Sequence, residues 1–251
     1  MNGILRAVTV TGCCVGLLAG CAGALNWNPR GSSGQAQEPV TAEPIPGQYT
    51  IRPGDTLYSI AWRYGLDYHD VAAWNGIGSD YLIKPGQTLV LAAPSRYIAS
   101  STKSATRTGV VVTRSQAAVS EDYAPPSGPL TWIWPAKGAL VRLYHPNHPL
   151  SKGIDISGVR GQDIMAAAPG KVVYTGSAII GYGNLIIIKN SEQFLSAYAD
   201  NDSMLVREGQ TVKAGERIAT MGLDRDGHPL LHFEIRYNGK PVNPLSYLPA
   251  H

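Results

Sequence analysis

Apolar residues gather in two stretches of this 251-residue chain, and the segments that flank these stretches have almost nothing to bury. Residues 21–47 and 93–129 are rich in Gly, Ser, Thr, Gln and Pro, a composition typical of flexible tethers and linkers. We therefore expect two folded blocks, residues 48–92 and residues 130–251, joined by the second of these segments. The total length suits one small and one medium-sized domain.

The N-terminal segment predicts export. A single Arg is followed by residues 7–20, which are apolar or small and too few to span a bilayer comfortably. The run closes on Leu18-Ala19-Gly20-Cys21, which resembles the lipobox of bacterial lipoproteins. The resemblance implies that residues 1–20 are a signal peptide and that Cys21 is acylated. Because Ala22 rather than Asp follows, it also implies an outer-membrane anchor facing the periplasm. An ordinary signal peptide with a chance cysteine is the alternative.

Cysteine positions and net charge narrow the classes further. Cys13 and Cys14 lie in the segment that would be removed, so the mature chain would keep only the acylated Cys21. Neither a disulfide nor a thiolate metal site is then available. The net charge of +3 comes without dense Lys or Arg runs, which fits an anionic envelope surface and does not indicate nucleic-acid binding.

The first block predicts a small α+β domain with the order strand, helix, helix, strand. Apolar residues at Leu57, Ile60, Ala61 and Tyr64 follow a helical face, and glycines stand where helices would end. The expected elements are a strand at 49–51, a helix that Asp55 caps and Gly65 ends, a helix from Asp67 to Gly76, and a strand at 88–91.

Three motifs in this block resemble the LysM family: Tyr49-Thr50-Ile51-Arg52-Pro53-Gly54-Asp55-Thr56-Leu57, Trp74-Asn75-Gly76 and Ile83-Lys84-Pro85-Gly86-Gln87. The resemblance implies binding of peptidoglycan, through glycans that contain N-acetylglucosamine. The sugar would lie between the loops at 54–57 and 81–85, with polar groups on its N-acetyl and hydroxyl groups and apolar side chains on its ring. The alternative to glycan binding is that Asp55 only caps its helix and Leu57 only packs in the core of the block. The expected glycan-binding residues are Gly54, Asp55, Thr56, Leu57, Ile83 and Pro85.

The second block predicts a mainly β domain. Short β-branched runs bounded by Gly recur along it, and no stretch keeps a helical period. The expected strands lie at 132–134, 171–174, 184–188, 194–198, 211–212 and 231–237. Two fragments, Ser151-Lys152-Gly153-Ile154-Asp155-Ile156 and Leu230-Leu231-His232-Phe233-Glu234-Ile235, alternate in the β manner, which places Leu230 and His232 on one face.

With Gly181-Tyr182-Gly183-Asn184 and Tyr198-Ala199, these fragments resemble the LytM, or lysostaphin-type, metallopeptidase family. Active members of that family cut peptidoglycan cross-bridges with a zinc ion held by His-x-Gly-x-Asp and His-x-His motifs. Here Ser151, Asp200 and Leu230 stand where the family has histidines, and only Asp155 and His232 remain. Catalytic zinc needs three protein ligands and an open position. We therefore expect no cofactor, no hydrolysis, and a hydrogen bond between the two remaining residues.

Other histidines could in principle complete a metal site. His145 and His148 precede Ser151, but prolines and at least six residues separate them from Asp155. His228 lies four residues before His232, next to Gly227 and Pro229, which favours an exposed turn. Because zinc ligand geometry is demanding, we do not expect these histidines to complete a metal site.

The whole arrangement resembles the NlpD-type lipoproteins, which join a lipobox, one LysM module and a degenerate LytM domain. The resemblance implies a regulator that activates a periplasmic N-acetylmuramoyl-L-alanine amidase during daughter-cell separation. The expected amidase-binding groove is lined by Ser151, Asp155, Asp200, Leu230 and His232. The alternatives are a zinc-dependent peptidoglycan endopeptidase with a non-standard metal site, and a passive tether between outer membrane and peptidoglycan.

Overall fold

The computed structural model describes residues 45–93, 129–147 and 151–250. The predicted signal peptide, the predicted acylation site Cys21, most of both low-complexity segments and His148 lie outside these described residues. All described residues belong to one compact unit, Val40–His251. Among them, no helix has the length and apolar character needed to cross a membrane.

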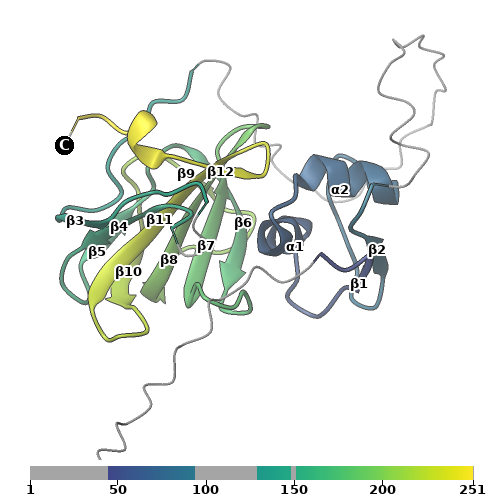
Figure 1. Cartoon of the computed structure of the whole chain (residues 1–251), viewed down its shortest axis with the longest axis horizontal. Helices are drawn as coiled ribbons and strands as arrows, with labels where there is room; N and C mark the ends of the chain where they lie inside the picture. Colours follow the sequence, from purple (N-terminus) through teal and green to yellow (C-terminus); the bar gives the residue numbers. More distant parts are fainter. Residues whose placement is uncertain (1–44, 94–128, 148–150, 251) are drawn as a thin grey trace, which may run out of the picture. The chain divides into compact units, whose positions relative to one another are not determined.

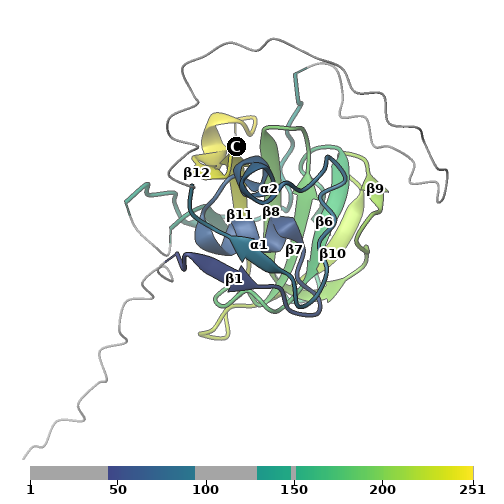
Figure 2. The ribbon, with the colours of Figure 1, turned by 90° about the vertical axis from the view of Figure 1, so that its right-hand side faces the viewer.

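The first block contains two short strands and two helices (Figure 2). The strands pair antiparallel, with Tyr49 opposite Leu89. The predicted order strand, helix, helix, strand is confirmed. The elements are β1 (Gln48–Thr50), α1 (Leu57–Tyr64), α2 (Tyr68–Asn75) and β2 (Thr88–Val90).

Helix ends in this block follow the expected chemistry with one exception. Gly65 and Gly76 take the left-handed conformation that ends α1 and α2, and Asp67 caps α2. The prediction that Asp55 caps α1 is wrong. Thr56 is the cap, because its hydroxyl accepts from the Ser59 amide while the Ser59 hydroxyl accepts from the Thr56 amide.

The second block is built on one ten-stranded sheet, in the order β3-β4-β11-β10-β8-β7-β6-β9, with β12 beside β11 and β5 beside β10 (Figure 1). The predicted mainly β class is confirmed. The strands are β3 (Leu140–Arg142), β4 (Ile154–Ser157), β5 (Asp163–Met165), β6 (Gly170–Gly176), β7 (Asn184–Lys189), β8 (Phe194–Met204), β9 (Thr211–Val212), β10 (Arg217–Leu223), β11 (Pro229–Tyr237) and β12 (Lys240–Val242), followed by a 3₁₀ turn, η1 (Pro244–Ser246).

The two faces of the central strands have different partners, because neighbouring side chains on a strand point to opposite sides. Leu231, Phe233 and Ile235 of β11 join the main core with Ile186 and Tyr198. On the other face, Leu185 and Ile187 of β7 lie beside Leu195, Ala197 and Ala199 of β8. This second face, which we call the outer face, also carries His232, Glu234 and Arg236 of β11. Their strand partners are Ala199, Ala197 and Leu195.

The expected strand at 132–134 does not form. Trp132 is instead a core side chain on an irregular segment, and the Ile133 amide donates to the Ala167 carbonyl. Aromatic and β-branched residues favour strands only because they fit a half-buried pleated surface. Packing against the core satisfies the same side chains without a ladder partner.

Candidate functional site

Asp155 and His232 meet because β4 and β11 pair in a register that places them directly opposite. The Nδ1 atom of His232 lies 2.6 Å from an Asp155 carboxylate oxygen. Asp155 is 1% exposed, so its negative charge is held away from water. The hydrogen bond expected from the sequence is confirmed.

The second ring nitrogen of His232 is also occupied. Nε2 lies 3.1 Å from Oε1 of Glu234, two residues further along the same strand face. Burial opposes a charged imidazole, but the hydrogen bonds and charges of Asp155 and Glu234 outweigh it and raise the pKa of His232 to about 9. Both ring nitrogens therefore face carboxylate oxygens, an arrangement that favours the doubly protonated imidazole.

Glu234 connects this histidine to Arg236. The Glu234 carboxylate is fully buried and accepts from Arg236 Nε at 3.0 Å and from the Tyr182 hydroxyl at 2.7 Å. Burial alone would raise the pKa of Glu234, but the Arg236 charge and then the His232 hydrogen bond lower it to about 2. Asp155, His232, Glu234 and Arg236 thus form a continuous row of alternating charges along the outer face.

Arg142 completes the row at its other end. Its Nη1 lies 3.0 Å from the second Asp155 oxygen, and its side chain is about half exposed. Each oxygen of the buried Asp155 carboxylate therefore has a cationic partner, one from Arg142 and one from His232. Sequence reasoning missed Arg142, Glu234, Arg236 and Tyr182. The even spacing of 232, 234 and 236 was the one available signal.

The three positions where the resemblance places missing histidines surround this row. Ser151 and Leu230 are 5% and 6% exposed. Asp200 has a positive φ of 60°, and its amide donates to the Tyr182 carbonyl. Burial, with a smaller addition from Asp155 and opposition from His232, raises the pKa of Asp200 to about 6. Ser151, Asp155 and Leu230 are thus closed off from solvent in this structure.

The proposed glycan-binding residues of the first block have structural roles of their own. The Asp55 carboxylate accepts from the Tyr49 hydroxyl at 2.7 Å and from the Arg52 amide at 2.9 Å, and it pairs with Arg63. Leu57 is fully buried. Gly54 has a φ of 84°, and Thr56 caps α1. Gly54 and Pro85 are exposed, and Thr56 and Ile83 are half-buried, so these four have surface for a ligand, whereas the Asp55 side chain is only 5% exposed.

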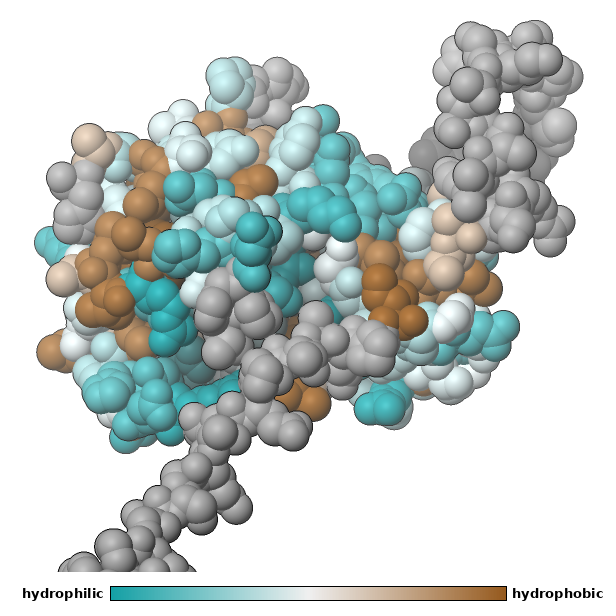
Figure 3. All heavy atoms as spheres, viewed as in Figure 1, coloured by the Kyte–Doolittle hydropathy of each residue, from teal (hydrophilic) through white to brown (hydrophobic). Residues whose placement is uncertain are grey.

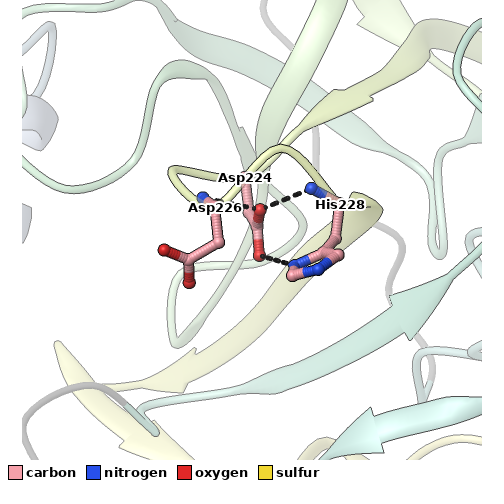
Figure 4. A group of neighbouring side chains, drawn as sticks. All are labelled: Asp224, Asp226 and His228. Carbon is pink, nitrogen blue, oxygen red and sulfur yellow. Dashed lines mark hydrogen bonds and ion pairs between the residues drawn. The ribbon is translucent and has the colours of Figure 1, made fainter. Parts of the chain in front are cut away.

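Among the residues that the structure describes, one group of potential metal ligands lies elsewhere, in the loop between β10 and β11. Asp224, Asp226 and His228 offer three ligand atoms within 4.8 Å of one another (Figure 4). One Asp224 oxygen already accepts from the amides of Asp226 and His228 at 2.9 and 2.8 Å, and the other pairs with the His228 ring. Asp226 and His228 are exposed, and these contacts close the turn between β10 and β11.

Comparison with known proteins identifies both blocks. Residues 149–244 match peptidase family M23, and residues 49–92 match the LysM domain. The lipoprotein YgeR of Escherichia coli (strain K12) is 44% identical, over 93% of this chain and 88% of that protein. A lipoprotein NlpD/LppB homolog of Pseudomonas aeruginosa is 41% identical, over 84% of this chain and 78% of its own. The murein hydrolase activator NlpD of Escherichia coli (strain K12) is 40% identical, over 80% and 67%.

The fold and the two matched regions define a protein that joins a LysM domain to an M23 peptidase domain. At about 40% identity over most of its length, the chain belongs to the family of NlpD-type lipoproteins.

Proposed function

We propose that this chain is a non-catalytic, outer-membrane-anchored lipoprotein that binds peptidoglycan and activates a periplasmic N-acetylmuramoyl-L-alanine amidase in daughter-cell separation. The observation that carries the proposal is the pairing of both remaining ligand-type residues. Asp155 and His232 bond to each other, and their free ends bond to Arg142 and Glu234.

The row of charges argues against a zinc site at this position. A zinc ion needs deprotonated ligands, whereas both nitrogens of His232 lie beside carboxylates that favour its protonated form. The Arg142 guanidinium lies 3.0 Å from the Asp155 oxygen that His232 does not contact. Ser151 and Leu230 offer no nitrogen ligand. The residues present do not fit a zinc ion, so no hydrolytic step follows from this domain.

A binding role for the preserved domain is supported by its relatives and its surface. Relatives of about 40% identity are named murein hydrolase activators. Apolar surface gathers over β3 in the view of Figure 3, where Val141 and Leu143 are 59% and 50% exposed on either side of Arg142. β3 is the edge strand of the large sheet, and an exposed apolar edge favours a protein partner.

Attachment to membrane and wall rests on the other parts of the chain. Relatives include an outer membrane antigenic lipoprotein of Haemophilus influenzae, which supports acylation of Cys21. The LysM match supports binding of an N-acetylglucosamine-containing glycan through Gly54, Asp55, Thr56, Leu57, Ile83 and Pro85. For Asp55 and Leu57 that role would run through the loops they hold in place, since their own side chains are engaged or buried.

The test mixes the full chain, purified in detergent, with candidate amidases and dye-labelled sacculi. We expect no dye release by the chain alone, and faster release by at least one amidase when the chain is added. Release by the chain alone that a chelator abolishes would show a zinc endopeptidase instead. If no amidase responds, and loss of residues 130–251 leaves cell separation unchanged, the protein is a tether.

A matched pair of variants locates the contact. Val141→Asp places a charge on the exposed β3 edge, and Leu205→Asp places the same charge on an exposed position after β8. We expect the first change to reduce activation at least fivefold and the second to leave it unchanged. Equal effects of the two substitutions on amidase activation would show that β3 is not part of the contact surface.

A further inference from the structure

The LysM domain packs against the outer face of the M23 sheet. Apolar residues of α1 and of the outer face belong to one buried cluster, which joins Ile60, Ala61 and Trp62 to Leu185 and Ile187. The described part of both domains lies in one compact unit. This face also carries the row of charges that starts at Asp155.

Trp62 of α1 lies directly on the end of that row. The Arg236 guanidinium stands 3.4 Å from the centre of the Trp62 ring, and its Nη1 donates to the Trp62 carbonyl at 2.8 Å. Cation–π contacts at such distances are strongest when desolvated, and Arg236 is 1% exposed. Tyr182 lies between Trp62 and the row of charges, since its ring contacts both Trp62 and His232 edge-on.

Further contacts hold the LysM domain at both sides of α1. The Lys240 ammonium, just after the turn that follows β11, donates to the Gly65 carbonyl at 3.2 Å. The Tyr68 hydroxyl of α2 donates to the Glu192 carbonyl in the β7–β8 turn at 3.0 Å. Gly239 lies so close that a Cβ atom there would stand 2.5 Å from the Leu66 carbonyl oxygen.

We infer that the LysM domain is a removable cover on the outer face of the M23 domain, which blocks the amidase-binding groove until α1 moves away. The inference rests on the proposed function. Arg236 is four residues beyond His232, about 13 Å along the strand. A partner segment that starts over His232 and runs along β11 for more than about two and a half helical turns, or about four extended residues, would therefore run into Trp62. Partner binding must then displace α1, and only its differential affinity for the open form can drive that change.

One substitution separates the domains with a matched control. Gly239→Ala forces a Cβ atom against the LysM backbone at Leu66 and Asp67, whereas Gly227→Ala meets nothing within 4 Å. The two glycines have similar positive φ angles, 72° and 83°, so both changes carry the same backbone strain. Trp62→Ala serves as a second opening variant, because it removes the ring on which Arg236 stacks.

Ala197→Cys reports the opening without any amidase. Ala197 is 1% exposed on the outer face, and the mature chain is expected to contain no other free thiol. In the full chain we expect slow labelling of this cysteine by a thiol reagent. Labelling should be at least tenfold faster with Gly239→Ala or Trp62→Ala, and unchanged with Gly227→Ala.

Amidase activation is then measured on dye-labelled sacculi with the same backgrounds but without the reporter cysteine. We expect the two opening variants to activate at several-fold lower protein concentration, and Gly227→Ala to behave as the unaltered chain. Rapid labelling of Ala197→Cys without a second substitution, or no faster labelling in either opening variant, would show that the LysM domain does not cover the outer face. Faster labelling with unchanged amidase activation would show that the LysM domain does not block the amidase-binding groove. If even the opened forms activate no amidase, the proposed function itself fails.

Discussion

Removal of the proton from His232 should destabilise the fold as the pH rises. The folded-state pKa is about 9, against an ordinary value of 6.5. The stabilisation is therefore fully present below pH 6.5 and is lost as the pH rises through 9. A shift of 2.5 pKa units corresponds to about 3 kcal/mol at 1.36 kcal/mol per unit. The cause is the position of the imidazole between two buried carboxylates, Asp155 and Glu234.

The measurement is urea unfolding of the full chain between pH 6 and 10, followed by circular dichroism. Other groups also contribute to the pH dependence, among them Lys152, because burial and the Arg236 charge lower its pKa. The control is therefore His232→Gln, which keeps polar atoms near both carboxylates but does not titrate. The difference between the two pH profiles isolates His232, and we expect it to change by about 3 kcal/mol across the range.

A difference that changes by less than about 1 kcal/mol would refute the reasoning. It would mean that His232 is largely neutral in the folded protein at pH 7. One ring nitrogen would then keep a lone pair, and the argument against a metal at this position would lose its main support. The same experiment thus tests the electrostatics and the proposed loss of catalysis.

Three other changes follow from the geometry. Asp200→Asn should raise the free energy of unfolding at pH 7 by about 2 kcal/mol, because the raised pKa of about 6 means that the fold disfavours the charged carboxylate. The stability that the protonated carboxyl contributes is fully present below pH 3.8 and is lost as the pH rises through 6. Urea unfolding should therefore show a gain for Asp200→Asn at pH 7 and none at pH 4. Gly153→Ala should cost at least about 3 kcal/mol and lower the melting temperature sharply, since its Cβ would lie 2.1 Å from the Phe233 carbonyl oxygen. Asp55→Ala should destabilise the LysM domain by about 1–2 kcal/mol through lost bonds to the loop and to Arg63, seen as an earlier unfolding transition.

The LysM fold was predictable almost to the residue because local rules determine it. Glycines end both helices, Asp67 caps the second, and the two strands need only each other. The error at α1 has an equally local origin. Asp55 and Thr56 are both good caps, and the Asp55 carboxylate is already bound by Tyr49 and Arg52, groups that only the folded loop brings near.

The M23 sheet was predictable in class and less so in extent. Strands with continuous β-branched runs, such as β7, were found, whereas β3, β5, β10 and β12 were not. β3 and β12 are three residues long and stand at sheet edges, so side-chain pattern contributes little to them. The 11-residue β8 runs on to Met204 through Asp200 and Asn201, residues of low β propensity, because β7, β10 and β11 all pair with it.

At the site, the sequence predicted the pairing of Asp155 with His232 but not its charge balance. A buried carboxylate is stable in its charged form only where positive charge lies close to it. Here it finds two cations, one from the edge strand β3 and one from a histidine that Glu234 keeps protonated. The buried Glu234 carboxylate is in turn neutralised by Arg236, and the buried Arg236 guanidinium is stabilised by its contacts with the Trp62 ring and carbonyl. The charge balance around Asp155 therefore extends to the LysM domain. Movement of α1 away from the sheet would expose Arg236 to water, and we expect this exposure to weaken the row of charges.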